Sequence, residues 1–284
     1  MLRRDMPPAS LRDSARAVAP GFDELWIVED LPYAGGISQA TAVLEATAGI
    51  GGGAGPVVGH GIAPAPFRNA AALAMEWATL AEMYHGRFAA GVGHGVQSWM
   101  AQIGEQTDSP LTLLAETIEV TQQLLAGERV TVDGRYVSID GLELVFPPLQ
   151  PPRVSAGVMG PRSLELSGRI AGGTVLPEGR SPDDIIAARA MIDRGRAAAG
   201  RTDLHRLTVF TGFYCGPLHE LGPPPPDAPQ GWAAVAETPA ACAAQLQTIL
   251  DAGVESLVLV PFGDDMESQL CLAAVDIVPL LGRG

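Results

Sequence analysis

Hydrophobic and polar residues follow two patterns that alternate along the chain. Short runs rich in branched and aromatic residues are typical of buried strands. Between these runs, apolar residues recur every three or four positions, as they do on the buried face of a helix. The first pattern predicts strands over 24–28, 56–61, 87–92, 153–158, 173–176, 207–214 and 256–260. The second predicts helices over 10–19, 37–48, 68–84, 110–126, 163–171, 181–200, 239–252 and 265–282.

This alternation predicts the fold class. Strands that alternate with helices are parallel and are joined by right-handed crossovers. Because the seven strand runs are one fewer than the helices, we expect residues 2–4 to form a short first strand. Eight such units in 284 residues favour an α/β fold of the (β/α)8 TIM-barrel type over an open sheet. One domain over 1–284 is therefore expected.

Two segments interrupt the alternation. Residues 128–146 alternate with a period of two on either side of Asp133 and Gly134, which predicts an inserted β-hairpin. Residues 216–231 form a proline-rich loop after the strand at 207–214. Such a loop either covers a site or replaces a longer connection.

Composition and charge remove several classes of function. No apolar run reaches the roughly 18 residues that a membrane span needs, and the N-terminus lacks the features of a signal peptide, so we expect a cytoplasmic protein. The net charge of −14 argues against binding to nucleic acid or to anionic membranes. All 18 basic residues are arginine, which excludes internal Schiff bases and the P-loop lysine. The three cysteines lack metal-binding spacing and are expected to be buried thiols.

The carboxyl ends of the predicted strands carry glycine, histidine and acidic residues. In α/β barrels the chemistry lies at these ends, and glycines there allow a flat ligand to approach the backbone. We therefore expect a phosphorylated cofactor more than a hydrolase site. The residues at these ends are Glu29, Asp30, Gly59, His60, Gly61, Gly93, His94, Gly95, Pro177 and Glu178, together with the stretch 157–163.

The stretch GVMGPRS at 157–163 precedes a predicted helix and is a candidate seat for an anion. Backbone N–H groups at a helix start, the cation of Arg162 and the hydroxyl of Ser163 all favour a phosphate. A plain helix cap with Arg162 in a surface ion pair explains the same residues equally well. His60 and His94 are either histidines satisfied by backbone groups or, with Asp30, a metal site.

The sequence resembles the luciferase-like monooxygenase superfamily, and within it the oxidoreductases dependent on the deazaflavin coenzyme F420, including the methylenetetrahydromethanopterin reductase type. The resemblance rests on GFDELWIVED at 21–30, on the segment 57–95 with its PAPFRN, GRF and GVGHG motifs, and on GVMGPRSLELSGRIAGGTVLPE at 157–178. It covers nearly the whole chain. It implies a TIM barrel that binds coenzyme F420, or FMN as the alternative, at the carboxyl ends of the strands.

The resemblance also implies roles for individual residues. A non-proline cis peptide is expected at Gly61–Ile62, behind the cofactor ring, and Asp30 is expected near the polar edge of the ring. The family's sugar-phosphate dehydrogenases carry a histidine and a glutamate where this chain has Leu31 and Val96, so their reaction is not expected. Candidates for proton transfer are His94, Tyr33 and Glu178. The full set expected to contact the cofactor is Asp30, Gly61, Ile62, Ala63, Gly93, His94, Gly95, Val96, Gly157, Val158, Met159, Gly160, Pro161, Arg162, Ser163 and Glu178.

Hydride transfer to an unidentified small organic substrate is thus the leading hypothesis. A metal-dependent barrel hydrolase and a non-catalytic cofactor-binding relative remain as alternatives, the second because the first strand is short. The resemblance implies a homodimer, for which the helix at 68–84 offers Met75, Trp77 and Met83 as an apolar face.

Overall fold

The computed structural model describes residues 1–221, 231–263 and 265–282, which form an α/β TIM barrel with an eight-stranded parallel sheet. The strands follow the order β1-β2-β3-β6-β7-β8-β10, and β9 pairs with β8. Their bounds are β1 Glu24–Ile27, β2 Val57–Pro64, β3 Phe88–Gly93, β6 Val154–Gly157, β7 Gly173–Leu176, β8 Arg206–Cys215, β9 Ala233–Ala236 and β10 Ser256–Pro261. The predicted fold class is confirmed.

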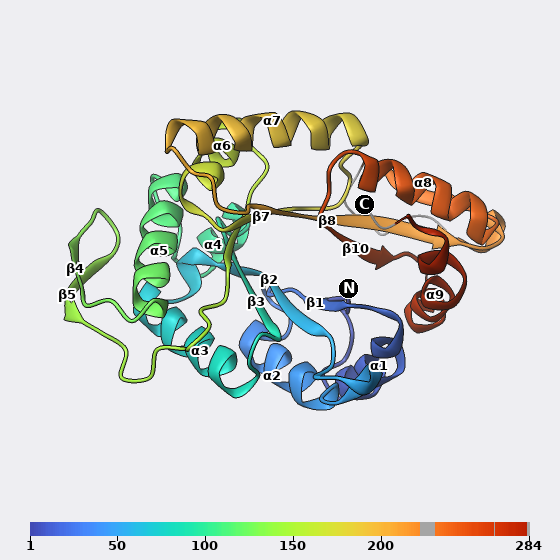
Figure 1. Cartoon of the computed structure of the whole chain (residues 1–284), viewed down its shortest axis with the longest axis horizontal. Coiled ribbons are helices and arrows are strands. Elements are labelled where there is room, and N and C mark those ends of the chain that lie inside the picture. The colour runs from blue at the N-terminus through green and yellow to red at the C-terminus, as the bar shows by residue number, and fades with distance from the viewer. Residues whose placement is uncertain (222–230, 264, 283–284) are drawn as a thin grey trace.

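Helices surround the strands in Figure 1, with α1 to α3 below, α5 at the left, α6 and α7 above, and α8 and α9 at the right. All eight predicted helices are found among the described residues, and α4, a short helix after β3, was missed. Their bounds are α1 Leu11–Val18, α2 Gly36–Ala46, α3 Ala70–Met83, α4 Gln97–Gln102, α5 Pro110–Leu125, α6 Pro161–Ile170, α7 Pro182–Ala198, α8 Pro239–Asp251 and α9 Met266–Leu272.

The core has two parts because successive strand residues face opposite sides of the sheet. Leu25 and Ile27 of β1 face outward and join the large apolar layer between strands and helices. Trp26, between them, faces the barrel interior and packs edge-on against Phe210, with ring centroids 5.6 Å apart. The apolar part of the interior is thus a second, smaller cluster, made of Trp26, Val175, Phe210, Val258 and Val260.

Residues 2–4 do not form the expected first strand. Instead, the amino group of Met1 donates to the carbonyl of Leu259 at 2.6 Å, and the N–H of Leu2 donates to the carbonyl of Trp26 at 2.9 Å. These two residues bridge β10 and β1, the two ends of the hydrogen-bonded strand order. The segment lies beside β1, as predicted. With one backbone hydrogen bond to β10 and one to β1, however, it is too short to form a strand.

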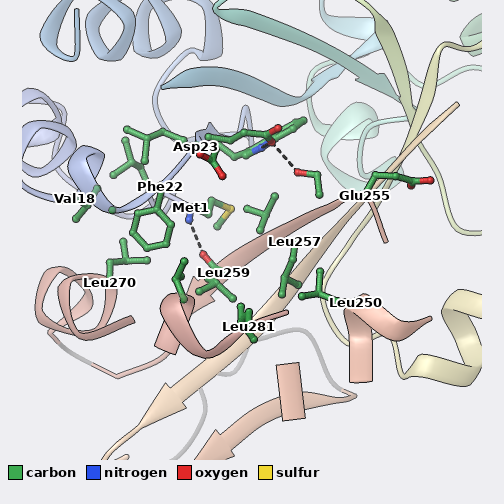
Figure 2. A pocket seen from close by; sticks show the side chains of 18 of the residues that line it. Met1, Val18, Phe22, Asp23, Leu250, Glu255, Leu257, Leu259, Leu270 and Leu281 are labelled. Carbon is green, nitrogen blue, oxygen red and sulfur yellow. Dashed lines mark hydrogen bonds between the residues drawn. The ribbon is translucent and has the colours of Figure 1, made fainter. Parts of the chain in front are cut away.

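A cavity of about 200 Å³ opens between β1 and β10 beside these bridging residues, and Figure 2 shows its lining. Asp23 and Glu24 line it from the start of β1, and Glu255 and Ser256 from the start of β10. It therefore lies toward the amino-terminal ends of the strands, away from the carboxyl ends where the candidate chemistry gathers.

The inserted hairpin is confirmed. Strands β4 (Val130–Asp133) and β5 (Ser138–Leu142) pair antiparallel and project beyond α5 in Figure 1. Of the proline-rich loop at 216–231, residues 222–230 lie outside the described residues. Strand β9, which follows that loop, was not predicted because its AAVA sequence carries little strand signal.

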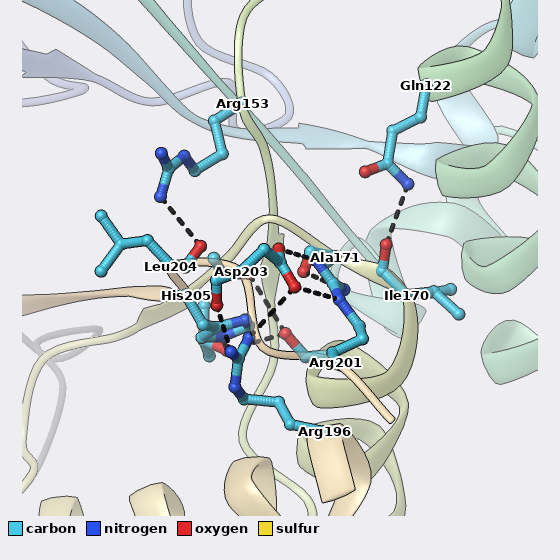
Figure 3. Close-up of polar contacts among 12 residues, drawn as sticks. Gln122, Arg153, Ile170, Ala171, Arg196, Arg201, Asp203, Leu204 and His205 are labelled. Atoms are coloured by element: carbon cyan, nitrogen blue, oxygen red, sulfur yellow. Dashed lines mark hydrogen bonds and ion pairs between the residues drawn. The ribbon is translucent and has the colours of Figure 1, made fainter. Parts of the chain in front are cut away.

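A polar cluster that is only partly buried fixes the connection between α7 and β8 (Figure 3). Arg201 forms an ion pair with Asp203 and donates to the carbonyl of Ala171 at 2.6 Å. His205 is 3% exposed, and its Nε2 lies 2.8 Å from the hydroxyl of Thr174 in β7. Burial, and then the neighbouring arginines, lower the pKa of His205 to about 4, so its ring is neutral at neutral pH.

Candidate functional site

The strand end of β2 carries a bulge that faces the barrel mouth. The Gly61–Ile62 peptide is cis, as the family resemblance implied, and the pairing of β2 with β3 shifts register between His60 and Ala63. Ile62 consequently packs toward the barrel interior, whereas Ala63 is fully buried in the outer layer beneath the helices. Of these two residues, only Ile62 turns its side chain toward the barrel mouth, which corrects the predicted contact of Ala63 with a cofactor.

The glycines around this bulge make room for Ile62. A Cβ added to Gly157 would lie 2.7 Å from Ile62 Cγ2, and one added to Gly93 would lie 2.8 Å from Ile62 Cδ1. The expectation that these strand-end glycines expose bare backbone to a flat ligand is therefore corrected. At Gly93 and Gly157 the missing side chains leave the space that the side chain of Ile62 occupies.

An acidic corner lies at the end of β1. Asp30 accepts a hydrogen bond from Arg4 Nη1 at 3.0 Å, and both side chains are about 30% exposed. The Arg4 guanidinium also lies over the rings of Tyr33, at 5.1 Å, and Trp99, at 6.0 Å. Arg4 was not among the predicted site residues, because a lone arginine near the N-terminus gives no sequence signal of its place in the barrel.

Glu178 approaches the same corner from the end of β7. Burial raises the pKa of Glu178, and the nearby Asp30 raises it further, while Arg4 opposes this effect. A raised pKa favours the protonated form of this carboxyl group and suits it to proton transfer. The predicted residues Asp30 and Glu178 are thus brought together.

Directly before Asp30, the buried carboxylate of Glu29 anchors this corner. It accepts two hydrogen bonds from Arg68, both at 2.7 Å, and one from the N–H of Gly36 at 2.9 Å. His60 Nε2 lies 3.4 Å from Glu29 Oε2. Burial alone would raise the pKa of Glu29, but the bonds from Arg68 and the other donors lower it well below its usual range. Glu29 is therefore ionised.

The predicted anion seat lies at the start of α6. Gly160 occupies the N-cap position without a side-chain cap, and Pro161 opens the helix. Arg162 is exposed and forms no hydrogen bond or ion pair with any other described residue. The alternative of a surface ion pair for Arg162 is not seen, so this cation and the helix N–H groups suit an anion.

Ser163 and His94 meet at this seat. Ser163 Oγ lies 3.0 Å from His94 Nε2, and His94 Nδ1 lies 3.2 Å from the carbonyl of Pro110. Burial lowers the pKa of His94, although the Pro110 carbonyl opposes this. The loop after β3 and the start of α6 are thereby joined.

Four further predicted residues lie around the mouth with different orientations. Val158 is buried in the outer layer, so its side chain does not reach the mouth, which corrects its predicted contact with a cofactor. Met159 and Val96 are exposed at 58% and 44%. Gly95 has a positive φ of 69°, the left-handed conformation that favours glycine, and it shapes the turn into α4.

The proposed metal pair does not form. His60 is fully buried beside Glu29 and packs edge-on against Trp77 at 6.2 Å, whereas His94 contacts Ser163. No group of three histidine, cysteine or acidic residues in the described part of the chain could hold a metal ion. The structure therefore gives the hydrolase hypothesis no site.

The family model for luciferase-like monooxygenases matches residues 3–220 of this chain. The chain belongs to the luciferase-like monooxygenase family. No described helix of this luciferase-like protein is long and apolar enough to cross a membrane.

Curated relatives of this luciferase-like chain include deazaflavin-dependent enzymes. The 5,10-methylenetetrahydromethanopterin reductase of Methanolobus tindarius is 33% identical over 181 residues, covering 64% of this chain and 53% of the reductase. The F420-dependent glucose-6-phosphate dehydrogenase of Nakamurella multipartita is 28% identical over 326 residues, covering 98% of this chain and 95% of the dehydrogenase. The matched part of the chain thus spans about half the length of the curated reductases.

Solved luciferase-like structures share the fold over nearly the whole chain. The coenzyme F420 dependent tetrahydromethanopterin reductase from Methanopyrus kandleri superposes with a TM-score of 0.83 at 19% identity, covering 98% of this chain and 97% of the reductase. An F420-dependent secondary alcohol dehydrogenase in complex with an F420-acetone adduct superposes with a TM-score of 0.85 at 17% identity. The match covers 99% of this chain and 97% of the dehydrogenase. The oxygenating constituent of 3,6-diketocamphane monooxygenase from Pseudomonas putida, in complex with FMN, superposes with a TM-score of 0.76 at 16% identity. The match covers 99% of this chain and 96% of the monooxygenase.

Proposed function

We propose that this protein is an oxidoreductase that transfers a hydride between coenzyme F420 and a small organic substrate. The observation that carries the proposal is the bulge at 60–63, which turns Ile62 toward a mouth bordered by the anion seat at Arg162. The curated relatives dependent on coenzyme F420 support this choice of cofactor over FMN.

The residues of the mouth fit a flat, phosphorylated cofactor. Ile62 would support one face of the ring, and the helix N–H groups with Arg162 and Ser163 would bind the phosphate. When bound, coenzyme F420 supplies the ring carbon that gives or accepts the hydride, so the protein needs only to orient ring and substrate and to exclude water. This requirement explains why the mouth holds few acid-base groups.

Glu178 or His94 would transfer a proton to or from the substrate. Glu178 is the stronger candidate, because burial raises its pKa and Asp30 and Arg4 lie near it. His94 is already engaged by Ser163 and the Pro110 carbonyl on its two ring nitrogens. Leu31 and Val96 provide no protic group, so we do not propose oxidation of a sugar phosphate, in spite of the similarity to the Nakamurella dehydrogenase.

A homodimer in the cytoplasm forms part of the proposal. Met75 and Met83 are exposed on α3, at 58% and 60%, and the N–H of Leu149 donates to Glu82 of the same helix at 3.4 Å. Leu149 is 86% exposed and extends this apolar surface. Trp77, by contrast, is fully buried against the barrel, which corrects its predicted place on the dimer face. None of the three cysteines forms a disulfide.

Titration of the purified protein with coenzyme F420 and, separately, with FMN tests the cofactor. We expect tight binding of coenzyme F420, seen as a change in its fluorescence, and weaker binding of FMN. Tighter binding of FMN would favour the flavin-dependent alternative, and binding of neither would refute the proposed function. Reduction of the bound cofactor by one of a panel of alcohols would show the direction of transfer and narrow the substrate class.

A further inference from the structure

The PAPFRN motif at 64–69 enters the site described so far only through the bonds from Arg68 to Glu29. β2 ends at Pro64, a turn of 3-10 helix follows over Ala65–Phe67, and Asn69 caps α3 by accepting a hydrogen bond from the N–H of Ala71 at 2.8 Å. Arg68 lies between the turn and the cap in extended conformation. The motif therefore holds one arginine at the carboxyl end of β2.

Arg68 binds Glu29 with both ends of its guanidinium. Nη1 lies 2.7 Å from Oε2 and Nη2 lies 2.7 Å from Oε1, a two-pronged geometry that lysine cannot reproduce. The Glu29 side chain is only 5% exposed and that of Arg68 is 22% exposed, so water and salt reach the pair only from the side of the arginine. Arg68 Nε also lies 3.4 Å from Glu76 Oε2 on α3, and this second ion pair helps to hold the guanidinium in place.

Glu29 joins three elements at one point. Besides Arg68, it accepts the N–H of Gly36 at the start of α2 and faces His60 in β2. A Cβ added to Gly36 would lie 2.1 Å from His60 Nε2, so the start of α2 packs directly on the histidine ring. Movement of any one of these groups would disturb the other contacts.

Two parts of the mouth follow immediately after residues of this network. Asp30, which pairs with Arg4, is the next residue after Glu29. Gly61, which begins the cis peptide beneath Ile62, is the next residue after His60. The acidic corner and the bulge are thus attached to the same buried carboxylate, although neither Glu29 nor Arg68 belongs to the proposed cofactor contacts.

We propose that Arg68 is a positioning residue that acts through Glu29 to hold the segment 28–36 and the bulge at 60–63 in the arrangement that binds the cofactor. The inference rests on the proposed function for the identity of the cofactor. The positioning of segments 28–36 and 60–63 by Arg68 and Glu29 is a property of the free protein. Arg68 touches neither cofactor nor substrate in this account.

The double variant Arg68→Met/Glu29→Met tests this role. It removes both charges and leaves no buried carboxylate unpaired, so the fold has a better chance of surviving than with Arg68 alone replaced. Arg194→Met/Glu165→Met is the matched control, because that pair lies on α7 and α6 with side chains 59% and 44% exposed. Arg68→Lys, which keeps the charge but loses the two-pronged bond, serves if the double variant does not fold.

Hydrogen–deuterium exchange of the free protein is the first measurement. We expect faster exchange in segments 28–36 and 60–64 of the double variant, smaller increases at the same segments in Arg68→Lys, and no change there in the control. Exchange that rises evenly over all strands, or that does not rise at all, would overturn the positioning role and leave Arg68 as a general contributor to stability.

Binding of coenzyme F420 is the second measurement, made at a temperature where circular dichroism shows each variant folded. We expect the dissociation constant to rise about tenfold or more in the double variant, a few-fold in Arg68→Lys, and not in the control. Unchanged affinity in a folded variant would overturn the proposal. If the wild type itself does not bind coenzyme F420, the proposed function fails, and the exchange measurement still decides the role of Arg68.

Discussion

His94 Nε2 lies 3.0 Å from Ser163 Oγ, a contact that joins the loop after β3 to the first turn of α6. The Pro110 carbonyl, 3.2 Å from His94 Nδ1, can only accept a hydrogen bond, so Nδ1 carries a proton. In the neutral ring Nε2 then accepts the proton of the Ser163 hydroxyl. The hydroxyl proton is thereby engaged by the histidine in the free protein and is not offered to an anion.

Anion binding at this seat should therefore respond to the protonation of His94. Burial lowers the pKa of His94 below its ordinary 6.5 in the free protein, and a bound phosphate should raise it. A group that binds a proton more strongly in the complex makes the affinity increase as pH falls. We expect affinity for coenzyme F420 to rise as pH falls from about 7 to 5, by about tenfold for each unit by which binding raises the pKa. His94→Gln should flatten this dependence in a titration at several pH values. A dependence that survives the substitution would assign it to another group.

Arg162→Ala should weaken cofactor binding without weakening the fold. Arg162 is exposed and forms no hydrogen bond or ion pair with another described residue, so its removal should leave the melting temperature unchanged within about a degree. The loss of one charge-assisted bond of about 1.5 kcal/mol corresponds to an affinity roughly tenfold lower. Arg12→Ala, at an exposed arginine on α1, is the control and should change neither quantity. Equal affinities for Arg162→Ala and the wild type would remove the phosphate assignment.

Stability should fall with acid because of His205. Its pKa is about 4 in the folded protein and about 6.5 in the unfolded chain, so the unfolded chain binds more protons between these values. This contribution to the free energy of unfolding is complete above about pH 6.5 and is lost as pH falls through 4. The difference of roughly 2.5 pKa units corresponds to about 3 kcal/mol.

Urea unfolding between pH 4 and pH 7 would measure this effect. His205→Gln keeps a polar group facing Thr174 and should show a shallower pH dependence of the free energy of unfolding than the wild type. An identical slope for both proteins would mean that other groups cause the acid sensitivity.

Gly157→Ala should disturb the bulge through Ile62. The added methyl group would lie 2.7 Å from Ile62 Cγ2, which forces one of the two to move and costs about 1–3 kcal/mol of unfolding free energy. Ile62→Ala in the same chain removes the colliding group, so the double variant should regain most of the loss caused by Gly157→Ala. A double-mutant cycle of unfolding free energies measures this coupling. Additive effects would show that the two residues do not meet in the folded protein.

Charged substitutions on α3 should separate the proposed dimer. Met75→Glu/Met83→Glu places two carboxylates on an apolar surface of this helix, and Ile186→Glu, at a residue 55% exposed on α7, is the control. Sedimentation at several concentrations should show a dimer for the wild type and the control, and a monomer for the double variant. A monomeric wild type would refute the proposed dimer.

The sequence by itself determined most elements of this fold, with α4 and β9 as the elements it missed and residues 2–4 as a predicted strand that does not form. The two hydrophobic periods set the strands and helices, since each period matches one geometry of side-chain burial. Ser181, for example, caps α7 in a reciprocal bond with Asp184, both within one turn of sequence. The family resemblance added the cis peptide at Gly61, which no periodicity predicts. Local chemistry of this kind is readable because its partners are close together in the chain.

Only the tertiary structure decided which side chains meet at the mouth. Arg4 pairs with Asp30 across 26 positions, Arg68 with Glu29 across 39, and His94 with Ser163 across 69. The bulge turned Ile62 toward the ligand space and Ala63 away from it, a choice that depends on strand register. Contacts of such range depend on how the strands of the sheet and their connections are arranged in space, and no local pattern encodes that arrangement.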